Sequence, residues 1–92
     1  MNTNDNPRQQ LIKALCRISS PKEMASVLDC LLTTKELQEI ENRLRIFEGL
    51  DQHLPQREIA ARLGVGIATV TRGAQVIKTD PYIVLKRHLG RV

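Results

Sequence analysis

The sequence predicts an all-α protein that carries a helix-turn-helix in its C-terminal half. Apolar residues recur at intervals of three and four, which is the spacing of one face of an α-helix. The 92 residues include one Phe, one Tyr and no Trp, so the core must consist mainly of Leu, Ile, Val and Ala. Finally, Gly64 and Gly66 separate two helical segments by the distance typical of a helix-turn-helix.

Two short helices are expected in the first third of the chain. Residues 1–7 are polar, which is typical of a flexible N-terminal arm, and residues 8–92 are expected to form a single helical domain. A helix over about residues 8–18 presents an apolar face made of Leu11, Leu15 and Ile18. The next helix, over about residues 21–31, is expected to have Ser20 as its N-cap and a proline at its first position.

The third helix is expected to be the longest, over about residues 34–51. Thr33 and Glu36 have the spacing of a capping box, in which each side chain accepts from the other residue's backbone N–H. An apolar stripe follows, made of Leu37, Ile40, Leu44 and Phe47. The opposite face carries Glu36, Glu39, Arg43 and Arg45, and we interpret it as a solvated face on which Glu39 supports Arg43.

The segment GVGIATVTRG, residues 64–73, has three possible interpretations: a turn that leads into a DNA-reading helix, a phosphate-binding loop, or an edge strand. Its glycines lack the spacing of a dinucleotide-binding loop, and no Lys-Ser/Thr pair directly follows any of them. No partner strand lies nearby. A short helix from Pro55 reaches Gly64, where a left-handed cap belongs, and a new helix starts at Ile67. The sequence therefore predicts a helix-turn-helix over about residues 55–78, with a helical hairpin as the structural alternative.

The predicted helix-turn-helix divides into residues that pack and residues that contact DNA. The packing set is Ile59, Ala60, Leu63, Val65, Val70 and Ile77. Arg57 is the best candidate for a guanine edge or a phosphate. The predicted DNA contacts are Gln56, Arg57, Gly66, Ile67, Ala68, Thr71 and Lys78. A single reading head buries little surface, so we expect a homodimer on a palindromic double-stranded operator, with half-sites roughly 34 Å apart.

Charge and composition limit the other possible functions. Lys and Arg number 14 against 10 Asp and Glu, and this net charge of +4 permits a polyanionic partner. The longest apolar run, residues 82–85, is too short for a membrane span, and the polar N-terminus is unlike a signal peptide, so a cytoplasmic protein is expected. Cys16 and Cys30 lack metal-binding spacing and are expected to be buried thiols, while His53 and His88 stand alone. No catalytic site, metal site or cofactor is expected, and the protein is not expected to be an enzyme.

Two stretches together resemble the tryptophan (Trp) repressor family of bacterial transcriptional regulators. They are LLTTKELQEIENRLRIFEGL and QREIAARLGVGIATVTRG, and the likeness extends over about residues 30–78. Its most specific parts are GIAT-x-TRG and the LT…NR-x-RI block. The resemblance implies six short helices in an intertwined homodimer whose subunits share one core. It also implies sequence-specific repression, with L-tryptophan as an allosteric corepressor and not as a catalytic cofactor.

The resemblance also implies a ligand site. In the family the tryptophan ring lies between two arginine side chains, which correspond to Arg43 and Arg72 in this chain. Arg72 would bind the carboxylate together with Thr33. A guanidinium group can both stack on an aromatic ring and bind a carboxylate with two hydrogen bonds, which Lys cannot do. The other implied ligand residues are Thr69 beside the ligand, Gly73 which leaves room for it, Glu36 near the indole edge, and the backbone carbonyls of Cys30 and Leu32 near the amino group.

Three features differ from the family pattern and leave alternatives open. Val76 stands where the family has a serine that receives the ligand's amino group, Ala60 replaces a lysine that contacts DNA, and the segment around residues 51–55 is one residue shorter. The alternative is therefore a Trp-repressor-like DNA-binding regulator with a different ligand or none. Two further alternatives are a DNA-binding piece of a recombinase-like enzyme, for which no catalytic cluster is visible, and a protein-interaction module.

Overall fold

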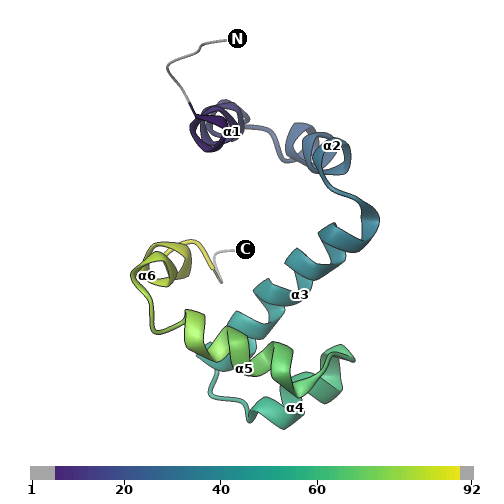
Figure 1. Ribbon diagram of the computed structural model, residues 1–92, viewed down its shortest axis with the longest axis vertical. Helices are drawn as coiled ribbons and strands as arrows, with labels where there is room; N and C mark the ends of the chain where they lie inside the picture. Colours follow the sequence, from purple (N-terminus) through teal and green to yellow (C-terminus); the bar gives the residue numbers. More distant parts are fainter. Residues whose placement is uncertain (1–5, 90–92) are drawn as a thin grey trace. The chain divides into compact units, whose positions relative to one another are not determined.

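The computed structural model describes residues 6–89 of the chain. This range contains six α-helices and no strand (Figure 1). In chain order they are α1 (Pro7–Cys16), α2 (Pro21–Leu31), α3 (Thr34–Asp51), α4 (Gln56–Leu63), α5 (Ile67–Val76) and α6 (Asp80–Lys86). The predicted all-α class is confirmed. The first five helices lie where the apolar spacing and the caps predict them, and the sixth was implied only by the family resemblance.

The chain divides into two compact units, one up to Leu37 and one from Gln38 onward. In the first unit α1 begins at a local cap, because Asn6 Oδ1 accepts the backbone N–H three residues further on at 2.8 Å and a proline follows at the first helical position. Of the arm predicted over residues 1–7, residues 1–5 lie outside the described residues, while Asn6 and Pro7 begin α1.

Helix α2 starts at the predicted cap, since the Ser20 hydroxyl accepts the backbone N–H of Glu23 at 3.3 Å. Neither α1 nor α2 contains a fully buried residue. Cys16 and Cys30 are exposed, so the prediction of two buried thiols is wrong for the single chain: the helices that carry them have no core of their own. The same helices also expose large apolar side chains, Leu11, Ile12 and Leu31.

The start of α3 is the predicted capping box. The Thr33 N–H donates to Glu36 Oε1 at 2.9 Å, and the Glu36 N–H donates to Thr33 Oγ1 at 3.1 Å. The bond from the Thr33 backbone, followed by the bond with its side chain, holds the pKa of the Glu36 carboxyl below its usual value. The pKa of this carboxyl is lower in the folded than in the unfolded chain. The capping box therefore stabilises the fold at pH values above the pKa that the carboxyl has in the unfolded chain. That contribution is lost as the pH falls through the folded pKa.

We expect Thr33→Ala to lower the free energy of unfolding by about 0.5–2 kcal/mol, because it leaves the N–H at the third helical position without its acceptor. Denaturant unfolding followed by circular dichroism measures the change. Thr33→Ser keeps the hydroxyl and is the matched control, with an expected loss close to zero. If the alanine and serine variants are equally stable, the capping bond contributes nothing to stability.

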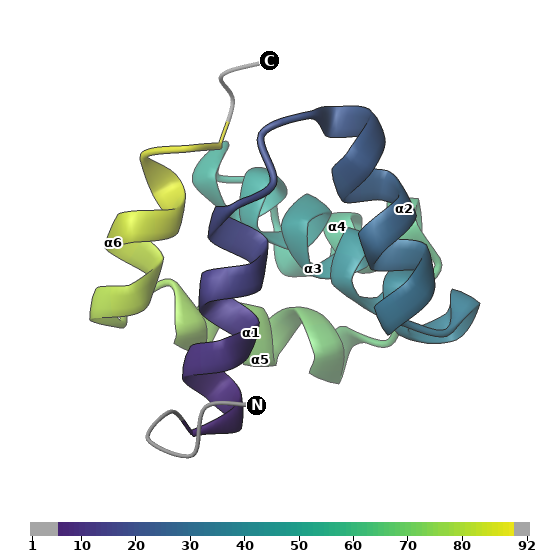
Figure 2. The same ribbon diagram turned by 90° about the horizontal axis from the view of Figure 1, so that it is seen from above.

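The second unit contains the buried core. Ile46 of α3, Ile59 and Ala60 of α4, and Val70 of α5 form one buried apolar cluster. The partly buried residues packed against it are Leu50, Leu54, Leu63 and Val65. Helix α6 lies at the end of α5 that is away from α4 (Figures 1 and 2), and its Tyr82 ring packs on Phe47 of α3 with ring centroids 5.3 Å apart. The core therefore joins the C-terminal half of α3 to the three helices that follow.

Two local features connect α3, α4 and α5. Helix α3 ends with His53 in a left-handed conformation (φ 62°), where the His53 N–H donates to Leu50 O and the next N–H donates to Gly49 O. Helix α4 ends at Gly64, also left-handed at φ 67°, as its position in the sequence predicts. The N–H groups of Gly64 and Val65 both donate to Ala60 O, which closes α4 tightly before α5 begins.

The buried face of α3 differs from the predicted stripe. Ile40 and Leu44 are 39% and 36% exposed, whereas Ile46 is only 1% exposed. The reason is that α4 and α5 pack on the face that contains Ile46 and Gly49, and Gly49 has no side chain to obstruct them. A Cβ at Gly49 would lie 3.0 Å from the Ile59 side chain. Of the predicted stripe, only Phe47 is fully buried within the chain.

Candidate ligand cavity and helix-turn-helix

The helix-turn-helix consists of α4 and α5, joined by Gly64, Val65 and Gly66. Val70 is completely buried between the helices, while Ile67, at the start of α5, is 47% exposed. Ala68 and Thr71 are exposed on α5 as well. The inward and outward faces predicted for the second helix are therefore confirmed by burial, and α5 presents a free surface at its N-terminal end.

One hydrogen bond links the exposed face of α5 to the front of α4. Thr71 Oγ1 lies 2.9 Å from Gln56 Oε1 and 3.0 Å from the Ile67 carbonyl oxygen. Two residues predicted to contact DNA are thus held side by side. Arg57 and Lys78 are both exposed, and neither forms an ion pair or side-chain hydrogen bond with any residue in the range 6–89. Their charges are available to phosphate groups.

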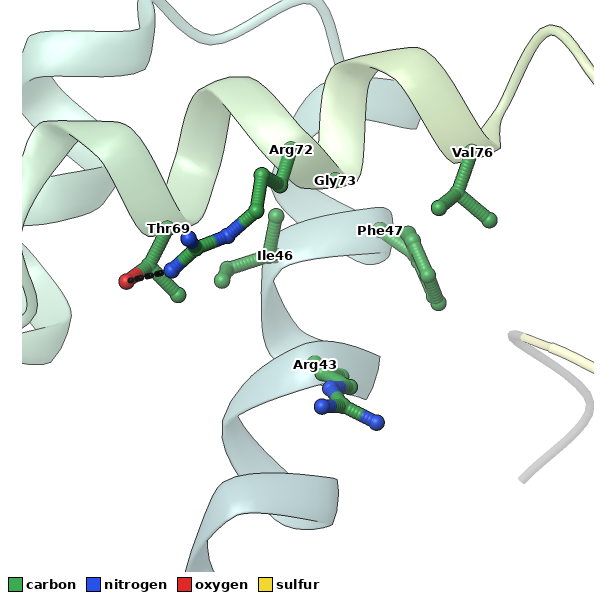
Figure 3. A pocket seen from close by; sticks show the side chains of 7 residues that line it. All are labelled: Arg43, Ile46, Phe47, Thr69, Arg72, Gly73 and Val76. Atoms are coloured by element: carbon green, nitrogen blue, oxygen red, sulfur yellow. Dashed lines mark hydrogen bonds between the residues drawn. The ribbon is translucent and has the colours of Figure 1, made fainter.

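A cavity of ≈ 310 Å³ lies between α3 and α5, on the side of α5 that contacts the core (Figure 3). Its lining consists of Arg43, Ile46, Phe47, Thr69, Arg72, Gly73 and Val76. This volume is at the lower end of the range of about 300–1,000 Å³ that is usual for small-molecule sites. Arg43 comes from α3 and Arg72 from α5, while Phe47 and Val76 supply apolar surface.

The two arginines of this cavity have few protein partners. Arg72 Nη2 is 3.4 Å from Thr69 Oγ1, which is a long hydrogen bond, and this bond runs along α5 (Figure 3). The Arg43 side chain has no hydrogen bond or ion pair within the described chain, and the predicted support from Glu39 is not formed. Two guanidinium groups therefore line one cavity without a neutralising carboxylate on either, an arrangement suited to an anionic ligand with a flat apolar portion.

A second cavity of ≈ 330 Å³ shares part of this lining. Its residues are Glu39, Asn42, Arg43, Val65, Thr69 and Arg72. Both cavities therefore contain Arg43, Thr69 and Arg72. The two cavities differ in their remaining residues, because the first adds mainly apolar side chains and the second adds a carboxylate and an amide.

The structure brings together four of the predicted ligand residues, namely Arg43, Thr69, Arg72 and Gly73. The other four, Cys30, Leu32, Thr33 and Glu36, belong to the unit that ends at Leu37, where Thr33 and Glu36 form the capping box. Sequence reasoning gave no site role to Ile46, Phe47, Glu39 or Asn42. Ile46, Phe47 and Glu39 lie three or four positions from Arg43, on the same face of the helix. Their spacing from a ligand arginine could therefore have predicted their place in the site.

Gly73 has a packing role in addition to its place in the cavity. A Cβ at this position would lie 2.7 Å from Ile46 Cγ2 and 3.8 Å from Leu50 Cδ1. Real Cβ atoms do not approach other side chains so closely. The glycine therefore lets α5 pack directly on Ile46 of α3, which sets the distance between the helices that carry Arg43 and Arg72.

The sequence also matches known proteins over most of its length. Residues 7–87 match the family model described as "Trp repressor protein". The chain belongs to the Trp repressor family. This is a family of DNA-binding transcriptional repressors and not of enzymes. No solved structure matches the chain significantly.

Three relatives named "Trp operon repressor homolog" show how far the likeness extends. The chain is 43% identical over 67 residues to the one from Xylella fastidiosa (strain 9a5c), covering 72% of this chain and 73% of that protein. It is 44% identical over 69 residues to the one from Haemophilus influenzae (strain PittEE), covering 71% and 68%. It is 45% identical over 56 residues to the one from Pasteurella multocida (strain Pm70), covering 60% and 55%.

The described part of the chain contains neither a membrane-spanning helix nor a cluster of metal ligands. No helix there is long and apolar enough to cross a membrane. Across residues 6–89, no group of three His, Cys, Asp or Glu side chains is placed to hold a metal ion.

Proposed function

We propose that this chain is a homodimeric repressor that binds a palindromic operator in response to L-tryptophan held between Arg43 and Arg72. The observation that carries the proposal is the position of α5. One side of this helix lines the cavity through Thr69 and Arg72, and its N-terminal end exposes Ile67. A ligand in the cavity therefore acts on the same helix that reads DNA. The protein acts in the cytoplasm, where its operator is.

The cavity suits the chemistry of an aromatic amino acid. A guanidinium plane stacks on an indole ring, and a second guanidinium can bind the carboxylate with two hydrogen bonds. Phe47 and Val76 add apolar contact for the ring. The family resemblance implies the remaining ligand contacts, and the proposal includes them. They are Thr33 at the carboxylate, Glu36 at the indole edge, and the backbone carbonyls of Cys30 and Leu32 at the amino group.

The DNA contacts divide between positioning and reading. Arg57 contacts a guanine edge or a phosphate, while Gln56 and Lys78 contact the sugar-phosphate backbone of the DNA. Ile67, Ala68 and Thr71 meet base edges, with Gly66 at the helix N-terminus beside them. Ile67 is suited to contact thymine methyl groups, because its side chain is apolar and exposed.

The exposed apolar faces support a dimer with a shared core. Large apolar side chains on α1, α2, α3 and α6 are more than one-third exposed, among them Leu11, Leu31, Ile40, Leu44 and Ile83. A chain of this size buries too little surface alone to be very stable, and a second copy that covers these faces would supply the missing core. Two reading heads fixed in one dimer are also what a palindromic operator requires.

The proposed mechanism is a coupling between two sites. Ligand between α3 and α5 fixes the angle of α5, so that both heads of the dimer enter successive major grooves together. Such coupling is usually worth about 1–3 kcal/mol, which corresponds to about 5- to 150-fold in affinity, and it is reciprocal. Operator DNA must therefore tighten tryptophan binding by the same factor by which tryptophan tightens operator binding.

The test uses the fluorescence of the ligand, because the chain contains no Trp. Duplexes selected from a random library by the protein with L-tryptophan provide the operator. We expect saturable binding of L-tryptophan that becomes about 5- to 150-fold tighter with the selected duplex, and D-tryptophan should bind less well. Equal affinity with and without the duplex contradicts the coupling, and absence of tryptophan binding contradicts the proposed ligand.

A second candidate function keeps the fold and the DNA contacts but changes the ligand. Val76 favours it, because this cavity residue offers no oxygen for an amino group. In that case a panel of aromatic acids and indoles would contain a tighter ligand than L-tryptophan, or no member of the panel would alter operator binding.

A further inference from the structure

We propose that Tyr82 of α6 limits the size of the aromatic ring that the cavity between α3 and α5 accepts, because it holds Phe47 in place from outside the cavity. This inference rests on the proposed function and concerns the selectivity of the same site. Tyr82 does not itself line the cavity, so it acts as a positioning residue. Neither the sequence patterns nor the family resemblance gives it a role in the site.

The contact between two aromatic rings provides the first argument. Phe47 lines the cavity of ≈ 310 Å³, and its ring also packs on the Tyr82 ring, with centroids 5.3 Å apart and ring planes tilted by 54°. Such tilted pairs are a favourable arrangement of aromatic side chains. Phe47 is 8% exposed and Tyr82 is 6% exposed, so both residues are buried. Because protein interiors are closely packed, Phe47 cannot give way to a larger ligand unless Tyr82 moves as well.

The attachment of α6 to α3 provides the second argument. Phe47 and Asp51 lie one helical turn apart on α3, and Tyr82 and Lys86 lie one turn apart on α6. The two aromatic rings pack together, and one turn further along Lys86 Nζ lies 3.1 Å from Asp51 Oδ1. Both charged side chains are exposed, so this ion pair adds little stability. Together with the ring pair, however, it attaches α6 at two points and keeps Tyr82 against Phe47.

The hydroxyl group of Tyr82 provides the third argument. Its oxygen is buried, yet it has no hydrogen-bond partner within residues 6–89. Burial, followed by the negative charge of Asp51, raises the pKa of this phenol, so the group is neutral near pH 7. A buried hydroxyl without a partner is unfavourable. What Tyr82 contributes at this position is therefore the volume and the flat surface of its ring.

The experiment measures the affinities of L-tryptophan and of analogues that carry one methyl group at a different free carbon of the six-membered ring. Ligand fluorescence gives each affinity for the wild-type chain and for Tyr82→Leu. In the wild type we expect the methyl group that is directed at Phe47 to weaken binding by about tenfold or more. Tyr82→Leu leaves space into which Phe47 can move, so this penalty should fall by about fivefold or more relative to L-tryptophan.

Tyr82→Phe is the matched control, because it keeps the ring and removes only the hydroxyl that has no partner within residues 6–89. The methyl penalties should stay as in the wild type, and the thermal unfolding temperature should be equal or higher. Thermal unfolding also shows that Tyr82→Leu is folded. Lys86→Met removes the ion pair to Asp51 and should lower the methyl penalty in the same direction by a smaller factor, and it decides the question if Tyr82→Leu does not fold.

Three results would contradict the inference while L-tryptophan still binds. The first is that no methyl group weakens binding to the wild type, and the second is that the methyl penalties are unchanged when Tyr82 is replaced by Leu. The third is an equal loss of affinity for all the ligands, which would mean that Tyr82 is only structural. If the wild-type chain binds none of the ligands, the proposed function fails and the inference fails with it.

Discussion

Arg72→Ala is expected to weaken L-tryptophan binding by about 10- to 150-fold while leaving the thermal unfolding temperature almost unchanged. A hydrogen bond between charged groups is worth about 1.5–3 kcal/mol, and Arg72 is expected to supply both such a bond and a stacking surface. The substitution should change the free energy of unfolding little, because the Arg72 side chain is exposed. Within the described chain this side chain forms one hydrogen bond, the 3.4 Å contact to Thr69. Titration of ligand fluorescence and a thermal melt measure the two quantities.

Arg72→Lys separates charge from shape at the same position. Lysine keeps the positive charge but lacks the flat group that stacks on a ring and binds a carboxylate with two parallel hydrogen bonds. We therefore expect it to restore little of the lost affinity. Arg45→Ala is the control, because Arg45 is an exposed arginine on α3 that lines neither of the two cavities around Arg72. If stability falls in proportion to affinity in Arg72→Ala, the residue is structural and not a ligand contact.

The caps of this fold could be predicted from sequence because each depends on residues within one turn of helix. Ser20, the Thr33 and Glu36 pair, and Gly64 all occupy the predicted positions. The end of α3 was less predictable. Its left-handed residue is His53, and residues other than glycine seldom adopt this conformation, so the proline two positions later was the only sign in the sequence that the helix ends here.

The packing partners could not be predicted in the same way. The apolar stripe of α3 is real, but the chain buries Ile46 instead of Ile40 because α4 and α5 pack on the face where Gly49 leaves space. Such a choice depends on contacts between helices, which helical periodicity does not encode. The ligand arginines were recognised by resemblance alone, since on periodicity they belong to a solvated face. The cavity that they line depends on the distance between α3 and α5.

That distance depends on Gly73, and Gly73→Ala is expected to destabilise the fold although alanine is the better helix former. The propensity gain is about 1 kcal/mol, while overpacking of a buried contact costs about 1–3 kcal/mol. The added Cβ would lie 2.7 Å from Ile46 Cγ2, and this methyl group is attached next to the backbone of a residue that is 1% exposed. Ile46 therefore has no free rotation by which to move away. We expect a net loss of up to about 2 kcal/mol in denaturant unfolding.

A double-mutant cycle identifies the cause of this loss. Ile46→Ala removes the methyl group that the new Cβ would meet, at its own cost of about 2–5 kcal/mol. On that background Gly73→Ala should become neutral or stabilising, because only the gain in helix propensity is left. The same substitution should thus have opposite signs in the two backgrounds. If Gly73→Ala is equally destabilising in both, the close approach of α5 to Ile46 does not explain the glycine, and its place in the ligand cavity becomes the better explanation.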